Sequence, residues 1–236
     1  MAAAAGGSGR FLVVLGAIAV AGGLALWQGT RRGDAGAGVA VTVQPGDTAG
    51  FRGYVLGSAD APVEIVEYAD YMCPHCGSFA AVQFPDVRSR LVEPGRVRWV
   101  FRDYPLPSNP HSIPAALAAA CADDQGRFWE MQEAIFLGQP QWGHERNPTG
   151  AFRDMARGLG LDIGAWNDCV GSRRHAGRIE ASYQEGNRLG VNSTPTFLIG
   201  GRLYAGNQPY DRIRALVDSL APPAPPAAPA PPAATP

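Results

Sequence analysis

The chain has 236 residues, of which 46% are hydrophobic and 17% charged, and its formal net charge is −1. This composition excludes a wholly disordered chain, because the apolar content is sufficient for a core. The near-neutral charge excludes a globally basic surface for nucleic acid, and the length suits one principal domain with appendages.

The N-terminal part of the chain is predicted to lie outside the folded domain. Residues 1–10 form a short segment, and an apolar stretch follows at residues 11–28. As a helix, its run from Phe11 to Trp27 would rise about 26 Å, close to the roughly 30 Å hydrocarbon core of a bilayer. It is either a membrane anchor or the hydrophobic region of a signal peptide, and the absence of a clean small-x-small site after Trp27 favours the anchor. Residues 29–50 are rich in Gly and Ala and predict a flexible linker.

The first half of the folded domain, predicted over residues 51–220, has a β-α-β pattern. The β-branched stretch Val63–Tyr68 predicts a buried strand, and a helical pattern follows the CPHC segment. Pro85 is expected to kink or break that helix. Val97–Tyr104 predicts a second strand, which should pair in parallel with the first.

The second half is predicted to be helical and then to return to strands. Residues 111–190 are mostly helical in pattern, Thr196–Ile199 and Arg202–Ala205 predict two strands joined by a Gly-Gly turn, and Tyr210–Leu220 predicts a closing helix. This order predicts an α/β thioredoxin fold with a helical insertion. The Pro- and Ala-rich tail, residues 221–236, is expected to be disordered.

The candidate chemistry lies at Cys73 and Cys76, which form a CxxC pair at the predicted start of a helix. Unpaired backbone N–H groups and the helix dipole stabilise a thiolate there, so Cys73 is expected to be the exposed nucleophile and Cys76 the buried resolving thiol. Pro74 suits the first helical turn, and His75 adds a hydrogen-bond donor or partial positive charge. A stabilised thiolate is a good leaving group, which favours a strongly oxidising disulfide.

A CxxC pair can also bind metal, or form a simple structural disulfide. Structural zinc takes four ligands, but Cys121 and Cys169 are isolated and the histidines form no ligand motif (His111, His144 and His175). We therefore expect surface histidines, no metal site and no cofactor. The two arginine-rich stretches, Arg96–Arg102 and Arg173–Arg178, are expected to be solvated faces.

Three segments in the expected order carry a resemblance to a known family. They are GSADAPVEIVEYADYMCPHCGSF at 57–79, VRWVFRDYPL at 97–106 and GVNSTPTFLIGG at 190–201. Together they resemble the DsbA-type thioredoxin domains in their membrane-anchored bacterial branch, over roughly residues 51–220.

The resemblance implies roles for individual residues. Cys73 and Cys76 match the redox pair, and Pro74-His75 matches the dipeptide that tunes it. Pro195 matches a cis-proline, and the backbone of Thr194 before it matches a site for pairing with a substrate strand. Glu67 matches a buried acid beneath the pair that could relay a proton to or from Cys76, although alone it would more often be a solvated strand residue.

The leading functional hypothesis is a dithiol oxidase for reduced exported proteins in the cell envelope, with its catalytic domain outside the cytoplasm. The resemblance implies reoxidation by a membrane quinone-linked thiol oxidase of the DsbB or vitamin-K-reductase type. A reductase or isomerase of the same fold, a metallochaperone and a non-catalytic thioredoxin-like module are the alternatives. In the leading hypothesis the compartment is oxidising, so Cys121 and Cys169 are expected to form a structural disulfide; two buried free thiols are the alternative.

Overall fold

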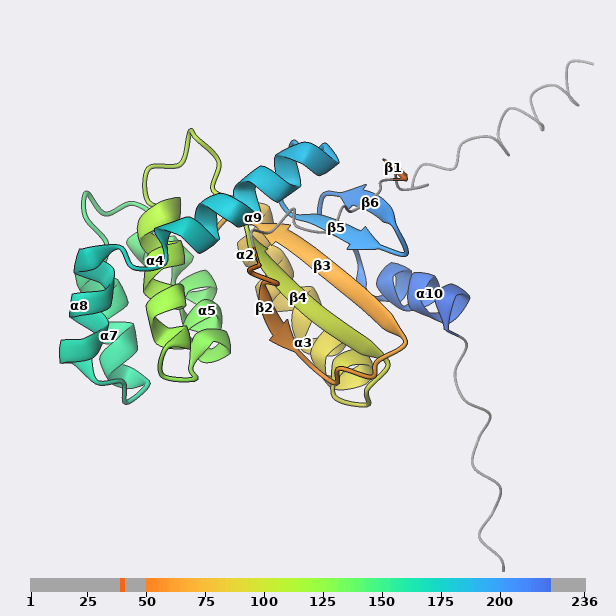
Figure 1. Ribbon diagram of the computed structural model, residues 1–236, viewed down its shortest axis with the longest axis horizontal. Helices are drawn as coiled ribbons and strands as arrows, with labels where there is room; N and C mark the ends of the chain where they lie inside the picture. The colour runs from red at the N-terminus through yellow and green to blue at the C-terminus, as the bar shows by residue number, and fades with distance from the viewer. Residues whose placement is uncertain (1–38, 41–49, 222–236) are drawn as a thin grey trace, which may run out of the picture. The chain divides into compact units, whose positions relative to one another are not determined.

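The computed structural model describes residues 39–40 and 50–221 (Figure 1). Its strands are β1 (Val39–Ala40), β2 (Tyr54–Leu56), β3 (Val63–Ala69), β4 (Val97–Asp103), β5 (Thr196–Ile199) and β6 (Arg202–Ala205). Its α-helices and π-helical segments are α2 (Pro74–Ser78), η1 (Phe79–Gln83), α3 (Phe84–Val87), η2 (Arg88–Val92), α4 (Ser112–Asp123), α5 (Phe128–Leu137), α6 (Gln139–Trp142), α7 (Thr149–Gly158), α8 (Ile163–Ser172), α9 (Ala176–Leu189) and α10 (Tyr210–Leu220). The predicted anchor at 11–28 lies outside the described residues, as do residues 1–10, nearly all of the linker and the tail beyond residue 221. Within the described part of the chain, no helix is both long and apolar enough to span a bilayer.

The six-stranded sheet has the order β1-β6-β5-β3-β4-β2. β3 and β4 pair in parallel, which confirms the prediction from the β-α-β pattern. β5 pairs antiparallel with β3 and with β6, and β2 pairs antiparallel with β4. β3 is therefore an interior strand, which accounts for its nearly continuous burial.

Helices cover the central strands from both faces (Figure 1). On one face, the helical segment after the CPHC motif and α10 pack on the sheet in a cluster that includes Ile65, Phe79, Trp99, Phe197, Ile213 and Val217. On the other face, Leu189 at the end of α9 and Val191 just after it pack against Tyr68, Val100 and Leu198. The central strands are thus held between apolar surfaces, and this fixes the positions of their ends.

The helix after the CPHC motif does not break at Pro85. Helical structure continues from Pro74 to Val92 because a π-helical segment precedes the proline. There the N–H of Phe84 bonds to the carbonyl of Phe79, five residues back. Pro85 then stands in the first turn of α3, where its missing N–H removes little.

The segment between β4 and β5 folds as the predicted helical insertion, α4 to α9. Helix α4 is at its centre, because its run of buried alanines lets neighbouring helices approach closely. Two buried indoles secure the packing: Trp142 donates to the carbonyl of Ile135 at 2.7 Å, and Trp166 donates to the carbonyl of Ala118 at 3.1 Å. The predicted fold class, an α/β sheet with a helical insertion, is confirmed.

Candidate active site

The topology brings the CxxC motif and the loop before β5 to one edge of the sheet. β3 runs antiparallel to β5, with Tyr68 opposite Thr196, so the end of β3 lies beside the start of β5. The Thr194–Pro195 peptide bond is cis, and the carbonyl of Thr194 accepts a hydrogen bond from the thiol of Cys73 at 3.2 Å. The proline loop therefore lies directly against the first cysteine.

The buried carboxylate of Asp70 holds the turn that leads to Cys73. One oxygen accepts hydrogen bonds from the N–H of Met72 at 2.7 Å and from the hydroxyl of Ser112. The other accepts from the N–H of Leu106 and the side-chain amide of Asn109, both at 2.8 Å. Asp70 thus joins the CxxC turn to the loop after β4 and to the first residue of α4. Sequence reasoning missed this residue, because its partners are distant in the chain.

Cys73 is the N-cap residue of α2, and the backbone N–H groups of His75 and Cys76 in the first turn act on its sulfur. The pKa of this thiol is lowered from 9.0 to about 5. The largest cause is a hydrogen bond from the Cys76 thiol; partial burial opposes it, and the N–H groups of Cys76 and His75 add to the lowering. The side chain was expected to be exposed, but the residue is only 6% exposed because the Thr194 loop lies against it.

Cys76 is fully buried, and the pKa of its thiol is raised. Burial is the main cause, followed by the hydrogen bond that the thiol gives to Cys73 and by the negative charge of that thiolate. The two thiols therefore differ in the direction expected for an attacking and a resolving cysteine. Pro74 and His75, between them, are exposed at the first turn of α2.

Glu67 lies in the middle of β3 and is only 2% exposed. Burial raises the pKa of its carboxyl from 4.5 to about 8, although the indole N–H of Trp99, 3.2 Å from one carboxylate oxygen, opposes the rise. Its charge contributes to the raised pKa of Cys76. The side chain is therefore a buried acid that holds its proton at neutral pH, close to the second cysteine.

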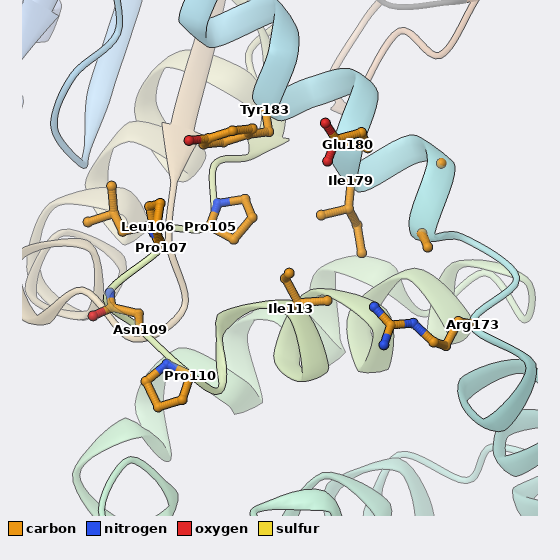
Figure 2. Close-up of a pocket in the computed structure, with 12 residues that line it drawn as sticks. Pro105, Leu106, Pro107, Asn109, Pro110, Ile113, Arg173, Ile179, Glu180 and Tyr183 are labelled. Carbon is orange, nitrogen blue, oxygen red and sulfur yellow. The ribbon is translucent and has the colours of Figure 1, made fainter.

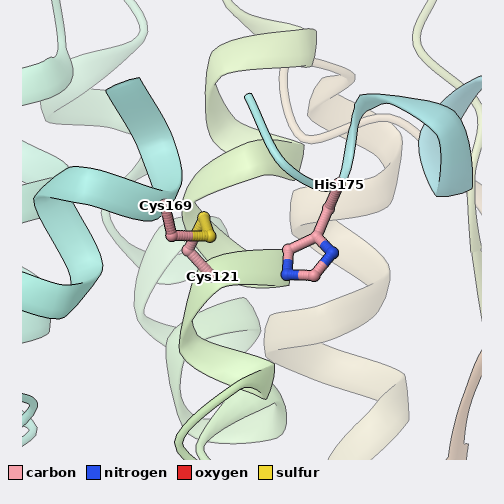
Figure 3. A group of neighbouring side chains, drawn as sticks. All are labelled: Cys121, Cys169 and His175. Carbon is pink, nitrogen blue, oxygen red and sulfur yellow. A yellow bond between two sulfur atoms is a disulfide. The ribbon is translucent and has the colours of Figure 1, made fainter. Parts of the chain in front are cut away.

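The other two cysteines form a disulfide inside the insertion (Figure 3). Cys121 on α4 and Cys169 on α8 have their Cα atoms 5.8 Å apart. The imidazole of His175 lies beside them, and its Nε2 is 2.9 Å from a carboxylate oxygen of Asp124. His175 is 6% exposed, so the expectation of a surface histidine was wrong here. These three side chains could reach one metal ion, but the disulfide uses both sulfurs.

The arginine-rich stretch in β4 is not simply a solvated face. Arg102 is buried and makes an ion pair of 2.9 Å with Glu185 of α9, which packs across the sheet. Next to it, burial raises the pKa of the Asp103 carboxyl to about 7. The arginine was misjudged because its partner is 83 positions away in the sequence and the pattern of β4 alone gives no sign of it.

A pocket of about 660 Å³ lies between α9, the start of α4 and the loop after β4 (Figure 2). Its lining is mostly apolar, with Arg173 and Glu180 on the α9 side. Neither cysteine of the CxxC pair lines it. The pocket therefore lies apart from the reactive sulfurs, although Leu106 and Asn109 in its wall bind Asp70.

Comparisons with known proteins identify the family of the domain and agree with its fold. Residues 51–219 match the sequence model of a family described as thioredoxin. Disulfide bond formation protein D of Bacillus subtilis is 26% identical over 170 residues, which cover 70% of this chain and 75% of that protein. The crystal structure of oxidised BdbD from Bacillus subtilis superimposes with a TM-score of 0.66 at 24% identity, covering 78% of this chain and 97% of the other.

A further relative is much longer than the matched region. The Na(+)/H(+) antiporter NhaA 3 of Salinispora tropica is 37% identical over 169 residues, or 71% of this chain. The match covers 24% of the antiporter, so the chain spans about a quarter of that protein's length. The similarity therefore concerns this domain and not the antiporter as a whole.

Proposed function

Since the chain belongs to the thioredoxin family, and within it to the DsbA-like protein disulfide oxidoreductases, we propose that it acts outside the cytoplasm as an oxidase that introduces disulfides into exported proteins. The direction of the reaction follows from the placement of Cys73 as the N-cap residue of α2, beside the fully buried Cys76, because this arrangement lowers the pKa of the Cys73 thiol to about 5. A thiolate that is stable at neutral pH leaves readily, so the reduced form of the pair is favoured and the disulfide form is a strong oxidant.

The proposed reaction has two exchange steps. A substrate thiolate attacks the sulfur of Cys73 in the Cys73–Cys76 disulfide, and the bond to Cys76 breaks. Cys76 leaves as a thiolate, and because the pKa of this buried thiol is raised, it takes up a proton. Glu67 is protonated at neutral pH and is the nearby buried acid that supplies it.

In the second step another substrate thiolate attacks the substrate sulfur of the mixed disulfide. The bond to Cys73 breaks, and Cys73 leaves as a stabilised thiolate. The substrate has then lost two electrons, and the cysteine pair has gained them. We propose that the backbone at Thr194, before the cis-proline, pairs with the substrate chain and holds it against Cys73 during both steps.

The reduced pair needs an electron acceptor to complete the cycle. We propose a membrane quinone-linked thiol oxidase, with residues 11–28 acting as an anchor that keeps the domain near this partner. Anchoring raises the effective concentration of the two proteins, so reoxidation becomes faster without any new contact.

The reduction potential of the Cys73–Cys76 couple tests the proposal. We expect the full chain, equilibrated with glutathione buffers, to give a potential above about −200 mV and to oxidise a reduced unfolded substrate. Cys73→Ser should abolish that activity. A potential of about −270 mV would instead assign the protein to the reductases.

A further inference from the structure

A side chain of the helical insertion, Gln139, forms hydrogen bonds with the backbone of the CxxC turn. Gln139 is the first residue of α6. Its Nε2 donates to the carbonyl of Tyr71 at 2.7 Å and to the carbonyl of Cys73 at 3.0 Å. The amide group has two N–H donors, so both are used on the two carbonyls that flank Met72. The insertion therefore holds the segment from which the reactive thiol projects.

The carbonyl of Cys73 has a second role in the first turn of α2. It also accepts a hydrogen bond from the N–H of Gly77 at 3.1 Å, which is the first bond of the helix. Gln139 thus binds the same oxygen that starts the helix, and it fixes the peptide plane next to the Cys73 sulfur. The N–H groups of His75 and Cys76, which stabilise that sulfur, belong to the same turn.

Gly77 makes room for this contact. A Cβ atom at position 77 would lie 2.7 Å from the side-chain oxygen of Gln139, too close for the glutamine to keep its place. Gly77 is buried in a regular helix and its φ is not positive, so the backbone does not require glycine. The close approach of Gln139 is the reason for a glycine directly after Cys76.

We infer that Gln139 is a positioning residue for thiol exchange at Cys73, and that the absence of a side chain at Gly77 makes room for it. The inference rests on the proposed function of the cysteine pair. Without Gln139 the two carbonyls lose a shared donor, and the turn is free to move the sulfur away from the helix N-terminus. The partial positive charge of the amide is lost as well. Both changes destabilise the thiolate, so they act in the same direction.

Gln139→Ala in the full chain tests the inference, with Gln141→Ala as its matched control. Gln141 lies in the same helix but is exposed. We expect Gln139→Ala to favour the Cys73 thiol over its thiolate by threefold or more, a rise of roughly half a unit in its pKa, measured from thiolate absorbance. The control should titrate like the unmodified chain.

Gly77→Ala gives a second, independent perturbation. It should shift the Cys73 titration in the same direction by displacing Gln139, and the shift should disappear when Gln139 is already alanine. Melting of each oxidised variant confirms that it is folded. A lower melting temperature for Gln139→Ala with an unchanged Cys73 titration and exchange rate would overturn the inference, as would additive effects of the two substitutions.

The two hypotheses fail separately. The Cys73 titration does not depend on oxidase activity, so it can support the positioning role even if the substrate or direction of the reaction differs. The proposed function would stand if the potential is oxidising and Cys73→Ser is inactive. If the Cys73 titration of Gln139→Ala is then unchanged, only the role of Gln139 is removed.

Discussion

Replacing Glu67 with glutamine should stabilise the protein at neutral pH. The amide keeps the shape of the side chain and can still accept a hydrogen bond from Trp99, but it has no charge to bury. In the folded protein the pKa of Glu67 is about 8, against an ordinary value of 4.5. At pH 7 the unfolded state has lost this proton and the folded state retains it, which lowers the free energy of unfolding by about 3 kcal/mol.

The pH dependence follows from the raised pKa. The penalty is absent below pH 4.5, where both states are protonated; it grows as the pH rises and is complete above about pH 8. Glu67→Gln should therefore be more stable than the unmodified protein by about 3 kcal/mol at pH 7 and equally stable at pH 4. Urea unfolding of the oxidised form measures this without titration of Cys73 or Cys76.

A matched control is available on the same strand. Glu64 pairs with Arg98 at 3.0 Å, but half of its side chain is exposed, so Glu64→Gln should change the free energy of unfolding by less than about 1 kcal/mol. The reasoning about Glu67 is refuted if Glu67→Gln and the unmodified protein unfold at the same urea concentration at pH 7, or if their difference is larger at pH 4. Glu67→Gln should also slow the step in which Cys76 takes up a proton.

Three further outcomes are expected. In the reduced protein the rate of alkylation at Cys73 should be half-maximal near pH 5, while Cys76 stays unmodified until the chain unfolds. Equal labelling of both thiols would contradict the assignment of Cys73 as the attacking and Cys76 as the resolving thiol. In the folded protein the pKa of Cys73 is about 5, below the ordinary thiol value of 9.0. Ionisation of this thiol should therefore add roughly 3 kcal/mol to the free energy of unfolding of the reduced form at pH 7. This gain is complete above pH 9 and is lost as the pH falls through 5. Denaturant midpoints should therefore show the reduced form above the oxidised form at pH 7, and the reverse order would favour a reductase. Replacing Cys121 and Cys169 together by serine should lower the free energy of unfolding by up to about 4 kcal/mol for their separation of 48 residues, and should leave the Cys73 titration unchanged.

The main strands could be predicted because local signals mark them. β5 and β6 are short runs bounded by a Gly-Gly turn, and β3 is rich in β-branched residues because most of this interior strand is buried. β2 was missed because three residues are too few for a periodic signal; its pairing with β4 decides its conformation. The course of the chain through Pro85 depends on a π-helical segment for which the sequence has no clear sign.

The residues of the candidate site also fall into those that the sequence predicts and those that depend on distant contacts. The cysteine pair and Pro195 belong to motifs that are contiguous in sequence, so their positions could be predicted. Gln139 acts through backbone carbonyls of another segment, and a backbone partner leaves no mark on residue identity at the distant position. Asp70 binds both N–H and side-chain groups, but all of them except Met72 lie at least 36 residues away. Such contacts become visible only when the fold has brought the segments together.

The hydrogen bond between Trp99 and Glu67 also gives the protein an optical signal of its own. The indole is fully buried, stacks on Phe79 with 5.9 Å between ring centroids, and donates its N–H to the carboxyl group. Loss of the Glu67 proton places a negative charge at the polar edge of the ring and alters its emission. The emission of Trp99, one of five tryptophans in the chain, is therefore expected to change with the protonation of Glu67.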